Sequence, residues 1–203
     1  MLDIALFPSA LGVRTGVDDA ATRLRRAGHD VHVIDQYDGE SFDDYETARQ
    51  HVESIGFPAL LQSALDATST MPDGFVVAGF SNGAGMAEHV ALHRPVAGVV
   101  LLSGALPLPF LGAPAWPSSV PVQLHYSSAD PFRDQAWVDG FLAVARASGA
   151  PVEFHDYPSG GHLFTDPGLP EEYDAESAEL LWKRVESFLD GLSRSPAGAT
   201  VLT

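Results

Sequence analysis

The sequence of 203 residues contains no cysteine. Disulfide bonds, thiolate metal sites and a cysteine nucleophile are therefore excluded for this chain. Basic residues are also scarce, because 11 lysines and arginines stand against 27 acidic residues, and the formal net charge is −16. A charge of this size repels nucleic acid and anionic membrane surfaces, so we expect neither of them as a partner.

Long apolar runs are missing as well. No stretch approaches the roughly 20 apolar residues that cross a bilayer, and the opening residues MLDIALFPS carry no basic segment ahead of their apolar run. We therefore expect no membrane span and no secretory signal, and a cytoplasmic location. The length predicts one domain over residues 1–193, followed by a small, polar and loosely ordered tail at 194–203.

The chain alternates between two kinds of segment. Six short runs rich in Val, Ile, Leu and Phe are predicted as buried strands, at residues 2–7, 30–35, 74–80, 97–103, 120–126 and 151–157. Stretches with helical periodicity lie between them, at 17–28, 45–68 with a break at Phe57-Pro58, 82–93, 133–148 and 171–192. This order predicts an α/β fold with a mostly parallel sheet of about six strands, helices on both faces and no large lid domain. The carboxyl ends of the strands then share one edge, where such sheets form their sites.

A serine stands between two glycines in the stretch GFSNG at residues 79–83, which fits the pattern G-x-S-x-G. The predicted strand FVVAGF precedes it and the helical stretch NGAGMAEHVALH follows it, which is the context that makes this short pattern specific. Glycines at 79 and 83 remove Cβ atoms where strand and helix approach each other. We therefore interpret Ser81 as a nucleophile, with the alternative that it only caps the helix, a position that serine favours.

A serine nucleophile needs a base, and the base needs an orienting acid. In this topology the acid and then the histidine follow the serine, each on a loop after a later strand. Asp130 follows the predicted strand 120–126 in SSADPF, and His162 follows the predicted strand 151–157 in PSGGHLF. The sequence thus predicts a triad of Ser81, Asp130 and His162, with Asp134 as a rival for the acid.

A tetrahedral intermediate also needs hydrogen-bond donors for its oxyanion. One expected donor is the backbone N–H of Asn82, directly after the serine. The second is expected in the loop FPSALG after the first predicted strand, where Ala10 is the best candidate. The alternative is that this segment is an ordinary loop between a strand and a helix.

At these residues the chain resembles the dienelactone hydrolase family of α/β-hydrolases. The resemblance covers most of the chain and runs through FPSALG, RLRRAGHDVHVIDQYDG, GFSNGAG and SSADP to YPSGGHLF, where the family has an ending of the form YP-x-x-x-H-x-F. It implies an α/β-hydrolase fold and hydrolysis of ester bonds. It also implies Ser81, Asp130 and His162 as the triad and the amides of Ala10 and Asn82 as the oxyanion donors.

Three positions depart from the resembled family. Its namesake enzymes have a cysteine at the elbow, where this chain has Ser81, and a glutamate in the first loop, where Ser9 stands. They also have an arginine four residues after the histidine that helps to hold a substrate carboxylate, where this chain has Asp166. Dienelactone itself is therefore not the expected substrate. The resemblance further implies that the chain begins at the family's third strand.

The substrate side of the site is expected along the edge that carries the predicted triad. The apolar, proline-rich loop 104–119 lies there and is either a pocket wall or a cover for the sheet. The side chains expected to contact the substrate are Leu11, Tyr37, Leu106, Phe110 and Trp116. His89 and His93 lie one helical turn apart, but no third ligand is evident and EHVALH lacks the zinc-protease order, so we expect no metal.

The leading hypothesis is a serine hydrolase that cleaves a small neutral ester, lactone or thioester through an acyl-enzyme, without a cofactor. A carboxylesterase or thioesterase of the acyl-protein thioesterase type is a close rival, because its elbow is similar to GFSNGAG. A non-catalytic binding protein with an α/β-hydrolase fold is the alternative from another class. The expected partner is a small-molecule substrate, and the chain is expected to be a monomer or a homodimer.

Overall fold

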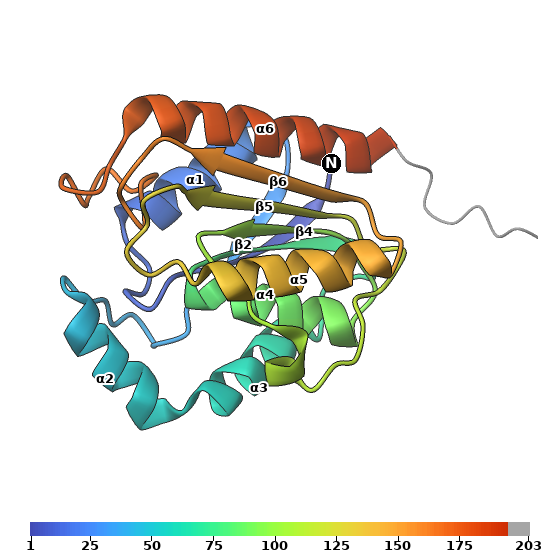
Figure 1. Ribbon diagram of the computed structural model, residues 1–203. Coiled ribbons are helices and arrows are strands. Elements are labelled where there is room, and N and C mark those ends of the chain that lie inside the picture. The colour runs from blue at the N-terminus through green and yellow to red at the C-terminus, as the bar shows by residue number, and fades with distance from the viewer. Residues whose placement is uncertain (195–203) are drawn as a thin grey trace, which may run out of the picture.

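One sheet between two layers of helices forms the part of the protein that the computed structural model describes, residues 1–194 (Figure 1). Its six strands are all parallel and have the spatial order β2-β1-β3-β4-β5-β6. The strands are β1 (Asp3–Phe7), β2 (Asp30–Val33), β3 (Phe75–Phe80), β4 (Val96–Leu102), β5 (Val122–Ser127) and β6 (Val152–Tyr157). The helices are α1 (Thr15–Arg26), α2 (Tyr45–Ile55), α3 (Phe57–Thr68), α4 (Asn82–His93), α5 (Gln135–Ala147) and α6 (Ala175–Arg194), with a short 3-10 helix, η1 (Leu108–Leu111). The predicted α/β class is confirmed.

Neighbouring side chains along each strand enter two separate cores, one on each face of the sheet. On one face, Ile4 of β1 belongs to a core that includes Leu24 of α1 and Trp182 of α6. On the other face, Phe7 of β1 belongs to a core that includes residues of α3, α4 and α5, among them Met86. Figure 1 shows α6 above the sheet and α4 and α5 below it. Strand β3 lies inside the sheet and is buried along its whole length, so the turn that follows it has a rigid support.

Two helices begin later than their periodicity predicts, because a carboxylate caps each of them. Helix α5 begins at Gln135 rather than at 133, since Asp134 accepts hydrogen bonds from the N–H groups of Ala136 and Trp137 at 2.9 and 3.2 Å. Helix α6 begins at Ala175 rather than at 171, and Asp174 accepts from the N–H of Ser177 at 2.9 Å. A cap residue has non-helical backbone angles, so the regular helix starts after it.

The predicted helix 45–68 is two helices, as the break at Phe57-Pro58 suggested. Gly56 separates them with a φ of 86°, a left-handed value that glycine adopts without strain. Asp44 caps α2 by accepting from the N–H of Thr47 at 2.8 Å. Figure 1 shows α2 beside the carboxyl ends of the strands, where it can border a site.

The predicted tail at 194–203 falls outside the described residues, apart from Arg194, which is the last residue of α6. Within residues 1–194, no helix combines the length and the apolar character needed to cross a membrane.

Candidate active site

Ser81 occupies a strained turn between β3 and α4. Its φ of 53° and ψ of −117° are unusual for a residue with a side chain, and its N–H donates to the carbonyl of Leu102 in the neighbouring strand at 2.8 Å. The side chain of Ser81 makes no capping hydrogen bond to α4. The alternative interpretation, in which this serine only caps the helix, is therefore not supported.

Glycines allow the three backbone segments around this turn to approach each other closely. A Cβ on Gly79 would overlap the carbonyl of Gly83, and a Cβ on Gly83 would overlap the carbonyl oxygen of Pro8 in the loop after β1. A Cβ on Gly104, in the loop after β4, would overlap the carbonyl oxygen of Ser81. The pattern G-x-S-x-G thus reflects steric contacts on both sides of the serine.

The structure brings the three predicted triad residues into one hydrogen-bonded chain. The Oγ of Ser81 lies 2.8 Å from Nε2 of His162, and Nδ1 of His162 lies 2.7 Å from Oδ2 of Asp130. The side chains of Asp130 and His162 are almost completely buried. Asp134, the rival for the acid, instead caps α5, as described above. The geometry therefore pairs the imidazole with Asp130.

Several further residues hold this chain in place and were not predicted from the sequence. The free oxygen of the Asp130 carboxylate, Oδ1, accepts from the N–H of Phe132 at 2.8 Å. The hydroxyl of Ser103 donates to the carbonyl of His162 at 2.7 Å, and the carboxylate of Glu172 accepts from the N–H of Leu163 at 2.7 Å. A polar residue at the end of β4 is a weak signal for Ser103, whereas the sequence contains no signal for Glu172.

The two predicted oxyanion donors lie on segments that border the same cavity as Ser81. Asn82 is the first residue of α4, where N–H groups have no partner within the helix. Ala10 belongs to a tight turn in which the N–H of Gly12 donates to the carbonyl of Ser9 at 3.0 Å. Ala10, Ser81 and Asn82 all line one cavity, which places the turn beside the serine.

The cleft around Ser81 has two compartments. The first, which we call the Leu106 compartment, has a volume of about 310 Å³ and is lined on its own side by Phe57, Ser103, Gly104, Ala105, Leu106, Tyr126, Asp134 and Trp137. The second, the α2 compartment, has a volume of about 460 Å³ and is lined on its own side by Ala10, Tyr45, Glu46, Arg49 and Val52. Ser81, Asn82, Phe132 and His162 line both.

Only Leu106, among the five side chains predicted to contact substrate, lines this cleft. Leu11 and Tyr37 are buried in the two cores, and Trp116 packs against Phe141 while its Nε1 donates to the carbonyl of Val120 at 2.8 Å. Phe110 is 65% exposed, and its ring centroid lies 5.4 Å from that of Trp137. These four side chains do not line the cleft, because Leu11 and Tyr37 belong to the cores, and most of the segment 107–120, which carries Phe110 and Trp116, packs onto the core.

The aromatic side chains that do line the cleft come from several elements. Tyr45 lies on α2, Phe57 on α3, Tyr126 on β5, Phe132 in the loop after β5, and Trp137 on α5. No local pattern in the sequence distinguishes them from aromatic residues of the core, since only the tertiary fold brings these elements to one place.

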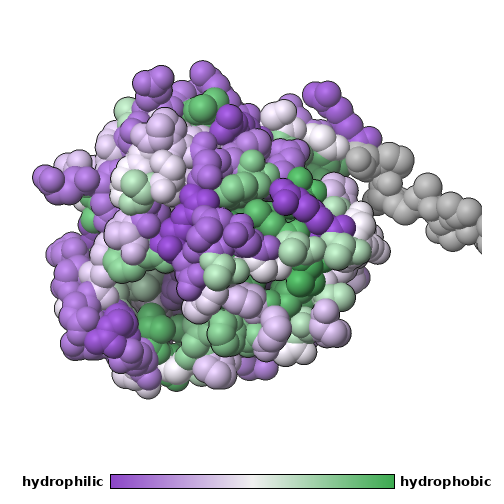
Figure 2. Space-filling model, viewed as in Figure 1, coloured by the Kyte–Doolittle hydropathy of each residue, from purple (hydrophilic) through white to green (hydrophobic). Residues whose placement is uncertain are grey.

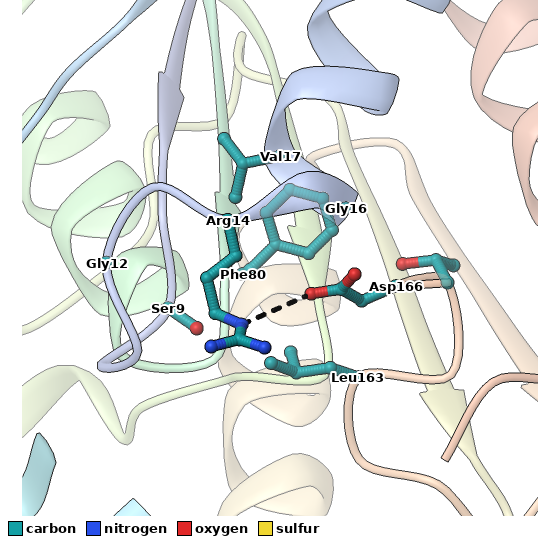
Figure 3. A pocket seen from close by; sticks show the side chains of 9 residues that line it. Ser9, Gly12, Arg14, Gly16, Val17, Phe80, Leu163 and Asp166 are labelled. Carbon is teal, nitrogen blue, oxygen red and sulfur yellow. Dashed lines mark ion pairs between the residues drawn. The ribbon is translucent and has the colours of Figure 1, made fainter. Parts of the chain in front are cut away.

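Two of the three departures from the resembled family meet in one small cavity behind the loop that carries Ala10. Figure 3 shows Ser9 and Asp166 on either side of Arg14, in a space of about 10 Å³, which is room for about one water molecule. Nε of Arg14 lies 3.9 Å from Asp166, and its Nη1 donates to the carbonyl of Phe42 and to Asp43 at 2.6 and 2.8 Å. Arg14 thus ties the first loop to the segment before α2.

The other arginines near the cleft are also paired. Arg133 bonds with the carboxylate of Asp156, and its Nε donates to Gln135 at 2.9 Å. Arg49, at the rim of the α2 compartment, bonds with both Glu46 and Glu53. Each of these guanidinium groups already has carboxylate partners, so the cleft offers little uncompensated positive charge.

A buried acid lies behind the Leu106 compartment. Glu88 of α4 is completely buried, and its Oε1 accepts from the N–H of Leu106 at 2.9 Å. Its second oxygen has no hydrogen-bond partner among the described residues. This burial raises the pKa of Glu88 well above its ordinary value, because the apolar surroundings favour the uncharged form of the carboxyl.

The two histidines considered as metal ligands do not form a ligand group. The rings of His89 and His93 lie 4.2 Å apart, and Nδ1 of His93 contacts the carbonyl of His89 at 2.8 Å. Among the described residues, three ligating side chains come together at Asp3, Asp30 and His32, at the opposite edge of the sheet from Ser81. Exposed acidic groups of this kind are common without a metal.

A parallel sheet with a strained serine after β3, and with an acid and a histidine on the loops after β5 and β6, defines an α/β-hydrolase fold. The model of the dienelactone hydrolase family matches residues 2–193, and the chain therefore belongs to that family. The resemblance drawn from the motifs is confirmed.

The individual relatives are distant. A protein of Saccharolobus solfataricus with the name "Putative carboxymethylenebutenolidase" is 31% identical over 117 residues, which cover 57% of this chain and 44% of that protein. A dienelactone hydrolase-like promiscuous phosphotriesterase from metagenomic libraries has a similar structure, with a TM-score of 0.74, 18% identity and coverage of 95% of this chain and 87% of the other. A "Putative Dienelactone Hydrolase" of Klebsiella pneumoniae has a TM-score of 0.70, 22% identity and the same coverage. The likeness to these two structures shows the fold alone.

Proposed function

We propose that this protein is a serine hydrolase that cleaves small neutral carboxylic esters, lactones or thioesters through an acyl-enzyme. The observation that carries the proposal is the buried chain of hydrogen bonds from Ser81 through His162 to Asp130. This order of contacts is the one that activates a serine hydroxyl. A protein that only binds ligands has no need for this chain, which speaks against the non-catalytic alternative.

The reaction begins when Ser81 Oγ attacks the carbonyl carbon of the substrate. His162 Nε2 removes the hydroxyl proton and then gives it to the leaving alcohol or thiol, while Asp130 holds the imidazole by its Nδ1–H. The N–H groups of Ala10 and Asn82 stabilise the oxyanion of each tetrahedral intermediate. Water then adds to the acyl-enzyme, with His162 as its base, and releases the carboxylic acid and free Ser81.

The paired arginines support a neutral substrate. A substrate carboxylate could bind one of these arginines only by displacing its present carboxylate partners. These are Asp43 and Asp166 for Arg14, Asp156 for Arg133, and two glutamates for Arg49. Removing a carboxylate from water without a free partner is unfavourable. The replacement of the family's arginine by Asp166 adds a negative charge to the same region. Thioesters remain within the proposed class, because the same chemistry releases a thiol.

The proposed function is tested by steady-state hydrolysis of neutral chromogenic esters. Ser81→Ala should lower kcat by about 10⁴-fold or more, and Asp130→Asn by about 10⁴-fold, since the amide can stabilise the wrong imidazole tautomer. Asp134→Asn is the matched control and should cost far less, because asparagine still caps α5. A severe loss in Asp134→Asn with a mild one in Asp130→Asn would show that the acid is misassigned.

A further inference from the structure

The two compartments of the cleft meet at Ser81, so a bound ester has one substituent in each. Ser81, Asn82, Phe132 and His162 are the residues that line both compartments. A carbonyl carbon within reach of Ser81 Oγ and His162 Nε2 therefore lies at the boundary. Its acyl substituent and its alcohol substituent extend in different directions, which makes the choice of compartment a question of specificity.

Phe132 marks the boundary between the compartments. Its ring centroid lies 4.9 Å from that of Tyr45 on the α2 side and 4.9 Å from that of His162. Its N–H bonds to the Asp130 carboxylate, which fixes the start of the side chain relative to the triad. Phe132 is 57% exposed and lines both compartments, so we place it at the mouth of the cleft between them.

We propose, on the basis of the proposed function, that the Leu106 compartment binds the acyl group and the α2 compartment binds the leaving alcohol. The substrate class is then a neutral ester with an apolar acyl group. The Leu106 compartment has a volume of about 310 Å³, far more than the roughly 10–15 Å³ that one water molecule needs on the same measure. It therefore has room for an acyl group larger than acetyl.

The order of the reaction steps indicates which compartment holds the acyl group and which holds the alcohol. The acyl group must stay bound while the alcohol leaves and water enters from the side of the departed alcohol. The Leu106 compartment is closed at its back by the buried residues Ser103, Ala105 and Tyr126. The α2 compartment is bordered by Glu46 and Arg49, whose side chains are more than half exposed. The Leu106 compartment thus has a buried back, whereas exposed charged side chains border the α2 compartment, and we assign the entering water to the α2 side.

One wall of the Leu106 compartment rests on α4. A Cβ on Gly85 would lie 2.5 Å from Cδ1 of Leu106 and 3.1 Å from Cζ of Phe57, so both side chains rest directly on this glycine. The hydrogen bond from the N–H of Leu106 to Glu88 fixes the backbone of the same wall. Removing the Leu106 side chain therefore enlarges the compartment at this wall.

Two series of esters test the assignment. The acyl series runs from acetate to octanoate with a fixed alcohol, and the alcohol series runs from ethyl to octyl with a fixed butanoyl group. Each additional methylene that the compartment buries should raise kcat/KM by about fourfold. The measured quantity is the ratio of kcat/KM for the longest and shortest member of each series, because this ratio cancels general losses of active protein.

Leu106→Ala should raise the acyl ratio by about tenfold, since the larger space buries one or two more methylenes. It should leave the alcohol ratio within about twofold. Trp137→Ala changes an exposed side chain of the same compartment and should raise the acyl ratio in the same direction. Val52→Phe narrows the α2 compartment and should lower the alcohol ratio about tenfold without changing the acyl ratio.

The matched control is Leu92→Ala, which is the same leucine-to-alanine change at a different place. Leu92 lies on α4, about 16 Å along the helix from Ser81. Neither ratio should change in that variant. The assignment is overturned if Leu106→Ala shifts the alcohol ratio and Val52→Phe shifts the acyl ratio, or if neither variant shifts either ratio. Absence of hydrolysis for every ester in both series would instead overturn the proposed function, and the assignment with it.

Discussion

At the scale of single residues, the site combines a strained serine with an acid that is buried outside the triad. The backbone of Ser81 is held at a positive φ by the packing of three loops, whereas Glu88 supports the wall of the cleft through one hydrogen bond to Leu106. Burying a carboxyl with only one of its oxygens bonded costs free energy, and the protein retains it directly behind the compartment assigned to the acyl group.

Glu88 should make the stability of the protein depend on pH. Its pKa in the folded chain is raised above the ordinary value of 4.5. As the pH rises through 4.5, the unfolded chain therefore releases a proton that the folded chain keeps. The folded state then binds more protons, and the free energy of unfolding falls with rising pH, by at most about 1.4 kcal/mol per pH unit from this group. The fall ends once the pH exceeds the raised pKa.

Glu88→Gln removes this titration and keeps an acceptor for Leu106. Urea unfolding at pH 5 and pH 8 should therefore show the variant gaining free energy of unfolding relative to the parent protein as pH rises. A difference between variant and parent that is the same at both pH values would show that Glu88 does not hold its proton in the folded state.

At the scale of secondary-structure elements, the geometry of the site depends on how closely α4 approaches β1 and β3. Gly83 lies on the first turn of α4, directly against the carbonyl oxygens of Phe7 and Pro8. The loop that carries Ala10 begins at the same point, so this contact fixes the distance between the two proposed oxyanion donors.

Gly83→Ala should lower the free energy of unfolding by about 1–3 kcal/mol, because its Cβ overlaps backbone that cannot move aside. It should also lower kcat, since the first loop and α4 must separate. Gly140→Ala is the control, because Gly140 is an exposed residue within α5, and among residues 1–194 the added Cβ meets nothing within 4 Å beyond its own stretch of helix. That variant should gain about 0.5–1 kcal/mol. Equal effects of the two substitutions in urea unfolding would contradict the steric account.

Much of this architecture could be predicted from local signals in the sequence. The strands and helices were found to within a few residues, because apolar runs and helical periodicity are local properties, and GFSNG identified the turn after β3. The starts of α5 and α6 were predicted too early. The helical periodicity extends upstream of the capping residues Asp134 and Asp174, so it does not mark where the helices begin.

The lining of the cleft was mostly missed for a different reason. Trp116 and Phe132 are both aromatic residues in loops, yet Trp116 is buried against Phe141 and Phe132 stands beside His162. The difference arises from how the 107–120 segment folds back onto the sheet, which no spacing in the sequence specifies. The three residues of the proposed triad were easier to predict, because the topology of the fold dictates which strand each of them follows.

At the scale of the whole molecule, the excess of acidic residues sets a negative field around the cleft. Figure 2 shows hydrophilic residues over much of α2, which borders the cleft, and of α6. The net charge of −16 belongs to the complete chain, and the arginines near the cleft are paired with carboxylates. An anionic ligand thus meets repulsion at long range and finds few free partners at short range.

Neutral short-chain esters should therefore be cleaved with a higher kcat/KM than matched anionic ones. The comparison is between an ethyl ester and its ω-carboxylate analogue at low and high ionic strength, and the gap should narrow as salt screens the long-range repulsion. Faster turnover of the anionic ester at low salt would contradict this account and would indicate that Arg14, Arg49 or Arg133 exchanges its carboxylate partner for the substrate.

The central claim is that Ser81 is a nucleophile activated by His162. The most direct measurement is covalent labelling with a fluorophosphonate, followed by mapping of the modified peptide by mass spectrometry. The account predicts one adduct, on Ser81, which is absent in Ser81→Ala and forms far more slowly in His162→Ala. No adduct on the intact protein, or an adduct that forms equally well in Ser81→Ala, would contradict it.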